Sequence, residues 1–296
     1  MQPPWADPDI LAAMRDGLLA WYEEHHRAFP WRETTDPYPI LVCEVMSQQT
    51  QLDRVEPAYE AFLHRWPTVG DLAASSTDAV VRFWTTHALG YNRRARFLHA
   101  AAVQIIEEFD GVVPRDPGRL QSLPGVGPYT ASAVAAFAYN APAAVLDTNV
   151  RRVLHRLGPP DPARDDAAVA DRLLPPGAAR AWNNAVMELG SQACAPTPRC
   201  DAAACPLRQW CHAYQTGDFS TPATPAQPTF EGSRRQLRGQ IVNILATEGP
   251  QAAAALRAAL RDRDLEPADD RRLDAALASL ERDALIQRVD DRYRVS

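Results

Sequence analysis

The stretch Leu123-Pro124-Gly125-Val126-Gly127-Pro128-Tyr129-Thr130-Ala131 decides the fold of this chain. Helical patterns lie on both sides of it, and Pro128 suits the first turn of the second helix, where an N–H group would be unpaired anyway. Two glycines one residue apart permit a tight turn and leave backbone amides exposed. Together with the positive end of the following helix, Gly125, Val126 and Gly127 predict a site for an anion such as a DNA phosphate.

Outward from this hairpin the sequence is helical over most of its length. Apolar residues recur at helical spacing, in runs of roughly 10–15 residues separated by Pro, Gly or Asp. The expected helices cover 9–28, 39–49, 53–65, 76–86, 92–109, 116–122, 128–138, 147–157, 165–174, 178–193 and 206–214. We therefore predict an all-α main domain over residues 1–215.

A linker and a second, smaller domain are expected after the main domain. The segment TGDFSTPATPAQPTF (216–230) holds three prolines and four threonines without periodicity, which is typical of a linker, here taken as 216–232. Helical patterns return at 233–247, 251–262 and 268–283, and the short runs 285–289 and 292–295 flank Asp290-Asp291. Three helices and a hairpin predict a winged-helix-like domain over 233–296. The alternative is a three-helix cap with a frayed tail.

Two carboxylates stand in contrasting surroundings. Asp147, in the segment VLDTNVRR (145–152), lies between an apolar run and a helical run, the usual place of an N-cap. Glu44 lies in ILVCEVMSQQT (40–50), whose apolar residues are expected to raise its pKa and favour the neutral acid. The amides of Gln48 and Gln49 follow and are able to probe a base edge. Such a pair suits cleavage of an N-glycosidic bond, in which an acid protonates the leaving base and an anion stabilises the sugar cation.

Four of the five cysteines are clustered, at Cys194, Cys200, Cys205 and Cys211. Four thiolates at such close spacing are able to hold a [4Fe–4S] cluster or a zinc ion. We favour the iron–sulfur cluster, because structural zinc sites more often contain C-x2-C pairs and none is present here. The fifth, Cys43, is expected to be a small buried apolar residue.

The charge composition excludes catalysis through a lysine Schiff base and bears on contacts with DNA phosphates. The formal net charge is −6, and all 31 basic residues are arginine, so no lysine is available for a Schiff base. Despite the acidic total, three arginine groups predict a phosphate-facing surface: Arg93, Arg94 and Arg96; Arg151, Arg152 and Arg156; Arg234, Arg235 and Arg238. No run approaches the ~20 apolar residues of a membrane span, and the first residues do not resemble a secretory signal, so we expect a cytoplasmic protein.

Taken in this order, these features resemble the helix–hairpin–helix DNA glycosylase superfamily and, within it, the MutY-type adenine DNA glycosylases. The resemblance covers about residues 20–215 and is carried by FPWR (29–32), EVMSQQT (44–50), LGY (89–91), the hairpin and LDTNV (146–150). It implies two helical subdomains with a cleft, a [4Fe–4S] loop, and release of adenine mispaired with 8-oxoguanine or guanine in double-stranded DNA.

The resemblance also implies a role for particular residues. Glu44 would be the general acid and Asp147 the stabiliser of the sugar cation, with Tyr129 and Asn149 assisting. Arg27, Trp31 and Asn184 match positions that line the adenine pocket, and Gln48 and Tyr91 match residues that wedge into the duplex, with Gln49 as a further DNA contact. The hairpin amides would hold the backbone while adenine is flipped out.

This sequence departs from the family pattern in three features. The cysteine spacing is x5–x4–x5 instead of x6–x2–x5, Ser47 replaces a leucine, and the C-terminal part is shorter than the Nudix-like domain of many MutY proteins. Because the chain has no lysine, we expect a monofunctional glycosylase. We also expect the protein to act as a monomer. The alternatives are a thymine or uracil mismatch glycosylase of the same superfamily, or a non-catalytic iron–sulfur DNA-binding regulator.

Overall fold

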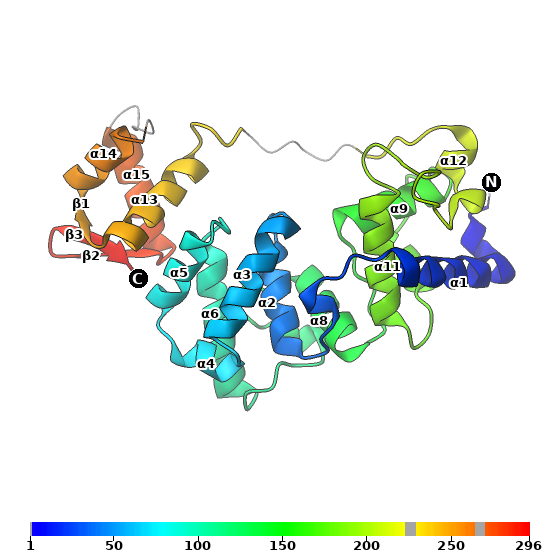
Figure 1. Cartoon of the computed structure of the whole chain (residues 1–296), viewed down its shortest axis with the longest axis horizontal. Coiled ribbons are helices and arrows are strands. Elements are labelled where there is room, and N and C mark those ends of the chain that lie inside the picture. The colour runs from blue at the N-terminus through cyan, green and yellow to red at the C-terminus, as the bar shows by residue number, and fades with distance from the viewer. Residues whose placement is uncertain (1, 223–228, 264–269) are drawn as a thin grey trace. The chain divides into compact units, whose positions relative to one another are not determined.

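The computed structural model describes residues 2–222, 229–263 and 270–296 and is helical as predicted (Figure 1). The all-α fold class is confirmed. The helices are α1 (Pro8–His25), α2 (Pro37–Ser47), α3 (Leu52–Arg65), α4 (Val69–Ala74), α5 (Thr77–Thr86), α6 (Arg93–Glu108), α7 (Pro117–Leu120), α8 (Pro128–Tyr139), α9 (Thr148–Leu157), α10 (Asp166–Leu173), α11 (Ala179–Gln192), α12 (His212–Thr216), α13 (Arg234–Glu248), α14 (Ala253–Arg261) and α15 (Asp270–Arg282). Three short 3-10 turns, η1 (Pro4–Ala6), η2 (Pro30–Arg32) and η3 (Arg208–Trp210), complete the helical set of the described residues.

One short helix and the segment 206–214 of the main part differ from the sequence-based expectation. The short helix α4 is not among the predicted helices. It begins with a capping box in which Thr68 accepts the N–H of Asp71 and the Asp71 carboxylate accepts the N–H of Thr68. The single helix expected over 206–214 is instead the turn η3 followed by α12.

The chain forms two compact units that are interleaved in sequence. The first comprises Met1–Leu41, Arg115–Gln121 and Val126–Thr224, and the second comprises Val42–Pro114, Ser122–Gly125 and Pro225–Ser296. Helix α2 therefore begins in one unit and ends in the other. The division of the chain at a 216–232 linker stays a prediction, and part of that linker, 223–228, lies outside the described residues.

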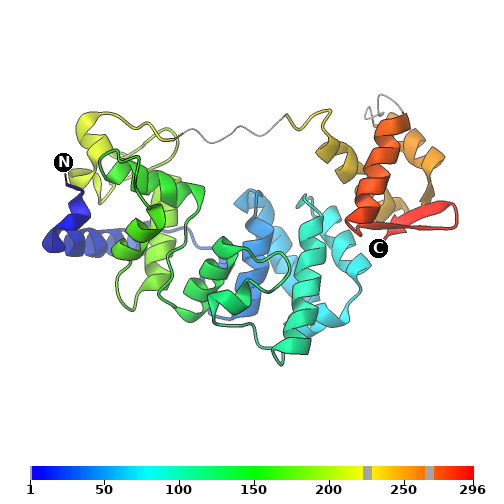
Figure 2. The same ribbon diagram turned by 180° about the vertical axis from the view of Figure 1, so that it is seen from behind.

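The core of the first unit lies where α1, α9 and α11 meet (Figure 2). Leu18, Leu154 and Leu189 are almost completely buried there. Near the chain start, the ring of Trp5 packs onto Gly158, where a Cβ atom would lie only 2.3 Å from it. Burial of these apolar side chains supplies the main favourable free energy of this unit.

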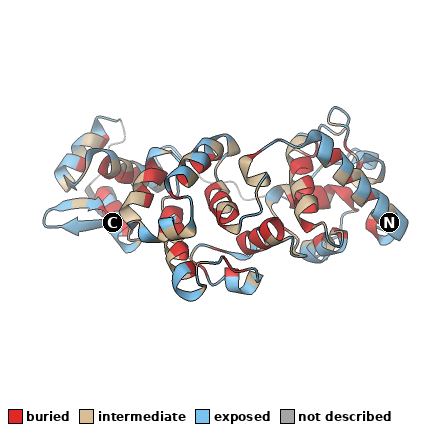
Figure 3. Cartoon of the chain, turned by 60° about the horizontal axis from the view of Figure 1, so that its bottom comes forward, coloured by how far each residue is buried: buried red, intermediate tan, exposed pale blue. Residues whose placement is uncertain are grey.

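In the second unit α5 packs on α6 and α4 packs on α6, and α3 contributes buried residues to the core. The rings of Phe62, Trp66 and Phe83 contact one another with centroids 4.7–5.4 Å apart. Figure 3 shows buried and exposed residues on opposite sides of many of the helices. Such offset and edge-on ring contacts add to the burial energy.

A buried arginine caps the C-terminal end of helix α2. The guanidinium of Arg94 donates through Nη1 to the carbonyls of Val45 and Met46, both at 2.9 Å, and through Nη2 to the carbonyl of Leu89 at 2.8 Å. The last carbonyls of a helix lack partners within the helix, so a cation there satisfies them and interacts favourably with the helix dipole. Burial lowers the pKa of Arg94 to about 10, which leaves it charged at pH 7. Arg94 is therefore not part of the predicted phosphate-facing surface.

The C-terminal part contains three helices, α13–α15, and a hairpin, as the sequence predicted. Strands β2 (Ile286–Val289) and β3 (Arg292–Val295) form an antiparallel hairpin that turns at Asp290, whose φ is 54°. An additional two-residue strand, β1 (Gln251–Ala252), pairs with β3, so the sheet order is β1-β3-β2. Residues 268–269 of the third predicted helix lie outside the described residues.

In the part of the chain that the structure describes, no helix has the length and apolar character that crossing a membrane requires.

Candidate functional site

Asp147 is the N-cap of α9. Its Oδ1 accepts the backbone N–H of Val150 at 2.6 Å, and its Oδ2 accepts the Nδ2–H of Asn149 at 3.0 Å. Burial raises the pKa of this half-buried carboxyl, although the two hydrogen bonds and the charge of Arg152 oppose that rise. The predicted capping role is confirmed, and the site holds one oriented carboxylate at the positive end of a helix.

A chain of hydrogen bonds links Asp147 to the cysteine segment. Asn149 accepts from Arg152 Nη2 at 2.7 Å, and Arg152 Nε donates to the carbonyl of Cys194 at 2.6 Å. Gly190 of α11 permits this geometry, because a Cβ there would lie 2.8 Å from the Cβ of Asn149. Asn149 is thus placed beside Asp147, as the resemblance implies.

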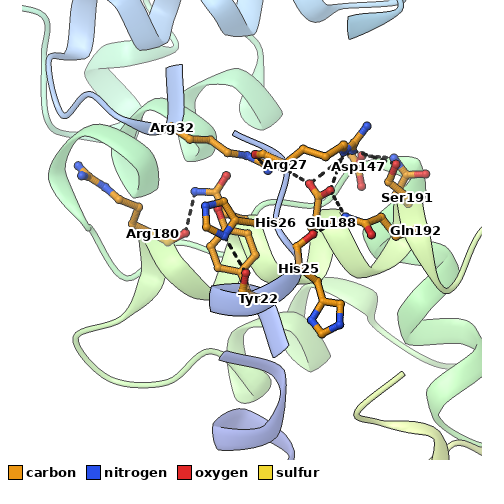
Figure 4. A network of polar contacts seen from close by, with 12 residues as sticks. Tyr22, His25, His26, Arg27, Arg32, Asp147, Arg180, Glu188, Ser191 and Gln192 are labelled. Atoms are coloured by element: carbon orange, nitrogen blue, oxygen red, sulfur yellow. Dashed lines mark hydrogen bonds and ion pairs between the residues drawn. The ribbon is translucent and has the colours of Figure 1, made fainter. Parts of the chain in front are cut away.

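Glu188 on α11 is a buried carboxylate that the sequence reasoning missed. Its side chain is fully buried, and Arg27, Arg32 and Gln192 point toward it (Figure 4). Arg27 Nε donates at 2.6 Å to one carboxylate oxygen, and Arg32 Nη2 donates to the other. Burial alone would raise the pKa of Glu188, but these hydrogen bonds and charges hold it below its usual value. The available sequence signal was a charged residue at a core-facing position of an apolar helix.

Two predicted pocket residues belong to the surroundings of Glu188. Arg27 also donates to Ser191 Oγ at 3.0 Å, and its guanidinium lies 5.1 Å from the centroid of Phe29. Trp31, in η2, stacks on Phe29 with a centroid distance of 4.8 Å and an interplanar angle of 8°. This segment therefore presents a flat, half-buried aromatic ring beside two fixed guanidinium groups, a combination suited to a planar heterocycle.

Asn184 and its neighbour Asn183 have different environments. Asn184 is half-buried and donates to the carbonyl of Arg180 one helical turn earlier, at 3.1 Å. Asn183 is buried, accepts the N–H of Val145 at 2.9 Å and donates to the carbonyl of Ala143 at 2.9 Å. Asn183 thus fixes the segment that leads to Asp147, a positioning role that the sequence reasoning did not assign.

Glu44 lies on α2 between the buried residues Cys43 and Val45 and is itself half-buried. The expectation that Cys43 is buried is confirmed. Gln48 is half-buried and its carbonyl accepts from Arg94, whereas Gln49 is exposed with a φ of 57°. The end of α2 therefore presents one acid and two amide side chains on a backbone that Arg94 holds.

The hairpin has the local geometry that its glycines predict. Gly125 has a φ of 77°, and a Cβ there would lie 2.7 Å from the Cβ of Phe97, so both backbone shape and space require glycine. Val126 is buried, whereas Gly127 is exposed as the N-cap of α8. Tyr129 is the second residue of α8 and is half-buried. An exposed turn at a helix N-terminus is suited to a phosphate.

Tyr91 is exposed, and an arginine lies against its ring. The backbone φ of Tyr91 is 46°, and 43% of the residue is accessible to solvent. The guanidinium of Arg94 lies 5.5 Å from the ring centroid. An exposed aromatic ring is suited to stacking on a nucleobase.

The four clustered cysteines line one cavity together with Arg156, Leu189 and Phe219; they are Cys194, Cys200, Cys205 and Cys211. Burial raises the pKa of Cys205 to about 12 and also raises those of Cys200 and Cys211. Arg156 is buried and donates to the Sγ and the carbonyl of Cys194, so this arginine too lies outside the predicted phosphate-facing surface. Among the described residues no three Cys, His, Asp or Glu side chains converge closely enough for a single metal ion. Two of these thiols, Cys194 and Cys205, are buried and the other two are half-buried, and the guanidinium of Arg156 lies beside them.

The Glu188 network generates a prediction for stability. Glu188→Gln leaves Arg32 and Arg27 without their carboxylate partner, so we expect the free energy of unfolding at pH 7 to fall by roughly 3 kcal/mol. Because the pKa of Glu188 lies below its usual value of 4.5, its contribution is present above that pH and is lost as the pH falls through the folded-state pKa. Urea unfolding at several pH values should show the wild-type advantage shrinking below about pH 4.5.

The matched control for this prediction is Glu24→Gln, which changes an exposed glutamate of α1. It should alter the unfolding free energy by less than about 0.5 kcal/mol at every pH. Equal losses in the two variants would contradict the structural role of Glu188.

Comparison with known proteins places this geometry in a family. Residues 42–176 match the HhH-GPD superfamily of base excision DNA repair proteins. An adenine DNA glycosylase of Mycolicibacterium smegmatis is 43% identical over 77% of this chain and 78% of its own length, and one of Mycobacterium tuberculosis is 42% identical over 93% and 91%. The solved structure of a thermostable thymine-DNA glycosylase has a TM-score of 0.64 and 28% identity, and the match covers 70% of this chain and 97% of that one. The chain belongs to the adenine DNA glycosylases of the HhH-GPD superfamily of base excision DNA repair proteins.

Proposed function

We propose that this protein is a base-excision-repair DNA glycosylase that hydrolyses the N-glycosidic bond of adenine mispaired with 8-oxoguanine or guanine in double-stranded DNA. The observation that supports this most strongly is the fixed carboxylate of Asp147, in a chain 42% identical to a mycobacterial adenine DNA glycosylase over 91% of that protein. Hydrolysis of the bond creates positive charge on the sugar, and a preorganised anion stabilises such charge.

Asp147 supplies that anion. The N–H of Val150 and the amide of Asn149 hold both of its oxygens, so the carboxylate does not need to reorient when the cation forms. Partial burial strengthens the attraction between this carboxylate and a developing cation, because the local dielectric constant is lower than that of water. Asn149 acts here as a positioning residue.

Glu44 supplies the acid. A carboxylic acid among apolar neighbours is suited to donating a proton to the leaving adenine, and the resulting carboxylate is then able to activate the attacking water. Tyr129 is proposed to assist the acid and the sugar intermediate, as the family resemblance implies.

The DNA contacts follow from the exposed features. Gly125, Val126 and Gly127 would hold a backbone phosphate, and Gln48, Gln49 and Tyr91 would contact the duplex. Arg27, Trp31 and Asn184 would line the pocket that receives the flipped adenine, with Glu188 fixing Arg27. We propose that the protein acts in the cytoplasm, at the nucleoid in a prokaryotic cell, and that it acts as a monomer.

Strand cleavage through a lysine Schiff base is unavailable because the chain contains no lysine. We therefore propose a monofunctional glycosylase. Thymine opposite guanine is a second candidate substrate, since a thymine-DNA glycosylase has a similar fold. The identity of 42–43% to adenine DNA glycosylases, against 28% to that protein, favours adenine.

We propose that Cys194, Cys200, Cys205 and Cys211 hold a [4Fe–4S] cluster. Such a cluster would tie the 194–211 loop together and would keep the thiolates deprotonated despite their burial. Within the chain itself, Arg152 and Arg156 bring positive charge to the backbone and sulfur of Cys194. These contacts support a site for an anionic group of thiolates.

The function is tested with Glu44→Gln. The amide cannot protonate the leaving base, so we expect single-turnover adenine release to fall by about 10²–10⁴-fold. Binding to a duplex with adenine opposite 8-oxoguanine, measured by fluorescence anisotropy, should stay close to that of the wild type. The control is Glu60→Gln, which changes an exposed glutamate of α3 and should leave release unchanged. Release at the wild-type rate by Glu44→Gln would contradict the assignment.

The cluster is tested by metal analysis of the purified protein. We expect four irons and four acid-labile sulfides per chain and a large loss of both in Cys205→Ser. Cys43→Ala should keep the full iron content, because Cys43 lies on α2 and does not line the cysteine cavity. One zinc ion per chain, with no labile sulfide, would contradict the proposal and indicate a zinc site instead.

A further inference from the structure

The C-terminal module, defined here as the described residues of 233–296, packs on helix α5 of its own unit and makes polar contacts with α6. Helix α13 lies against α5. Arg82 of α5 donates through Nη1 to the carbonyl of Ala246 at 2.6 Å and to that of Leu245 at 3.3 Å. Asp78 holds the other side of the same guanidinium at 2.7 Å. The arginine therefore binds carbonyls near the C-terminal end of α13, where a cation is favourable.

A second attachment is centred on Asp283, just after α15. Its carboxylate accepts from Arg238 Nη2 of α13 at 2.5 Å and lies 3.7 Å from Arg93 Nε of α6. The backbone carbonyl of Asp283 accepts from Arg96 Nη1 at 2.9 Å. These two attachments join the module to α5 and α6, one through the second turn of α13 and Asp283 and the other near the C-terminal end of α13.

The module places one side chain on Tyr91. Arg235, in the first turn of α13, donates through Nη1 to the Tyr91 hydroxyl at 3.0 Å. The Tyr91 ring also contacts the buried guanidinium of Arg94, at 5.5 Å from its centroid. Tyr91 is thus held by two arginines, one from α6 and one from the C-terminal module.

This arrangement matters because the ring is exposed. An aromatic side chain that stacks on a base must keep its orientation while the duplex approaches, and every side-chain rotation that is frozen beforehand reduces the entropic cost of binding. Arg94 supports the ring, whereas Arg235 restrains the hydroxyl end.

We propose that Arg235 is a positioning residue for Tyr91 and that the C-terminal module thereby sets how tightly the enzyme binds the mispair. The inference rests on the proposed function, in which Tyr91 contacts DNA. The module would then influence DNA binding without contacting a base itself, because it acts through the side chain of Tyr91.

A double-mutant cycle on DNA binding tests the proposal. Full-length proteins with Arg235→Ala, Tyr91→Phe or both are compared by anisotropy on a duplex carrying 2′-fluoro-2′-deoxyadenosine, which resists hydrolysis, opposite 8-oxoguanine. Each single variant should weaken binding by about three- to tenfold, and the double variant should be no weaker than either single one, since both remove the same hydrogen bond. Arg235→Lys keeps a donor and should recover most of the affinity.

Arg234→Ala is the matched control, because it removes the same charge from the same turn of α13 but at an exposed position. Its effect should be the same in the wild-type and Tyr91→Phe backgrounds. If Arg235→Ala behaves likewise, with equal losses in both backgrounds, Arg235 is a plain phosphate contact and the proposal is overturned. It is also overturned if Arg235→Ala has no effect.

Failure of the proposed function would look different. In that case the wild type would release no adenine from any duplex, whereas the coupling between Arg235 and Tyr91 would still be measured by binding alone. A normal rate of adenine release, together with absent coupling, would overturn only the role of Arg235.

Discussion

The guanidinium of Arg94 is the interaction on which the second unit depends. It lies among backbone carbonyls from the end of α2 and from the loop that leads to Tyr91, and it is buried to 7% exposure. Burying a charge is costly unless it is hydrogen-bonded, and here carbonyls at both sites accept hydrogen bonds from the two terminal nitrogens of the guanidinium. One cation therefore orders the helix that carries Glu44 and the loop that carries Tyr91.

In the first unit, a network of hydrogen bonds orders the chain around Asp147, as Arg94 orders the second unit. Asn183 holds the chain before Asp147, Asn149 holds its carboxylate, and Arg152 connects Asn149 to the carbonyl of Cys194. A change in the cysteine loop would thus reach the proposed catalytic carboxylate through three successive hydrogen bonds. This gives the loop a structural reason to be held together, independent of any redox role for a cluster.

Local signals in the sequence predicted much of the fold and most of the candidate site. The glycines of the hairpin, the N-cap at Asp147 and the clustered cysteines act within a few residues, so their spacing alone is informative. The helix α4 was missed although its capping box is equally local, because it is only six residues long.

The remaining features depend on partners distant in sequence. Arg94 and Val45 are 49 positions apart, Glu188 and Arg27 are 161 apart, and Arg235 and Tyr91 are 144 apart. An arginine that caps a distant helix and one that lies on the surface have the same appearance in a sequence. Only the packing of the helices distinguishes them, which is why the phosphate-facing groups were predicted to include Arg94 and Arg156.

The central claim is tested most directly by single-turnover cleavage of three duplexes by the wild-type protein. They carry adenine opposite 8-oxoguanine, adenine opposite guanine, or thymine opposite guanine, and each reaction is analysed with and without alkali. We expect the adenine strand to be cut, and only after alkali, since the enzyme leaves an abasic site and has no lysine to break the strand. Release of thymine with adenine left intact would contradict it, and so would strand cleavage without alkali.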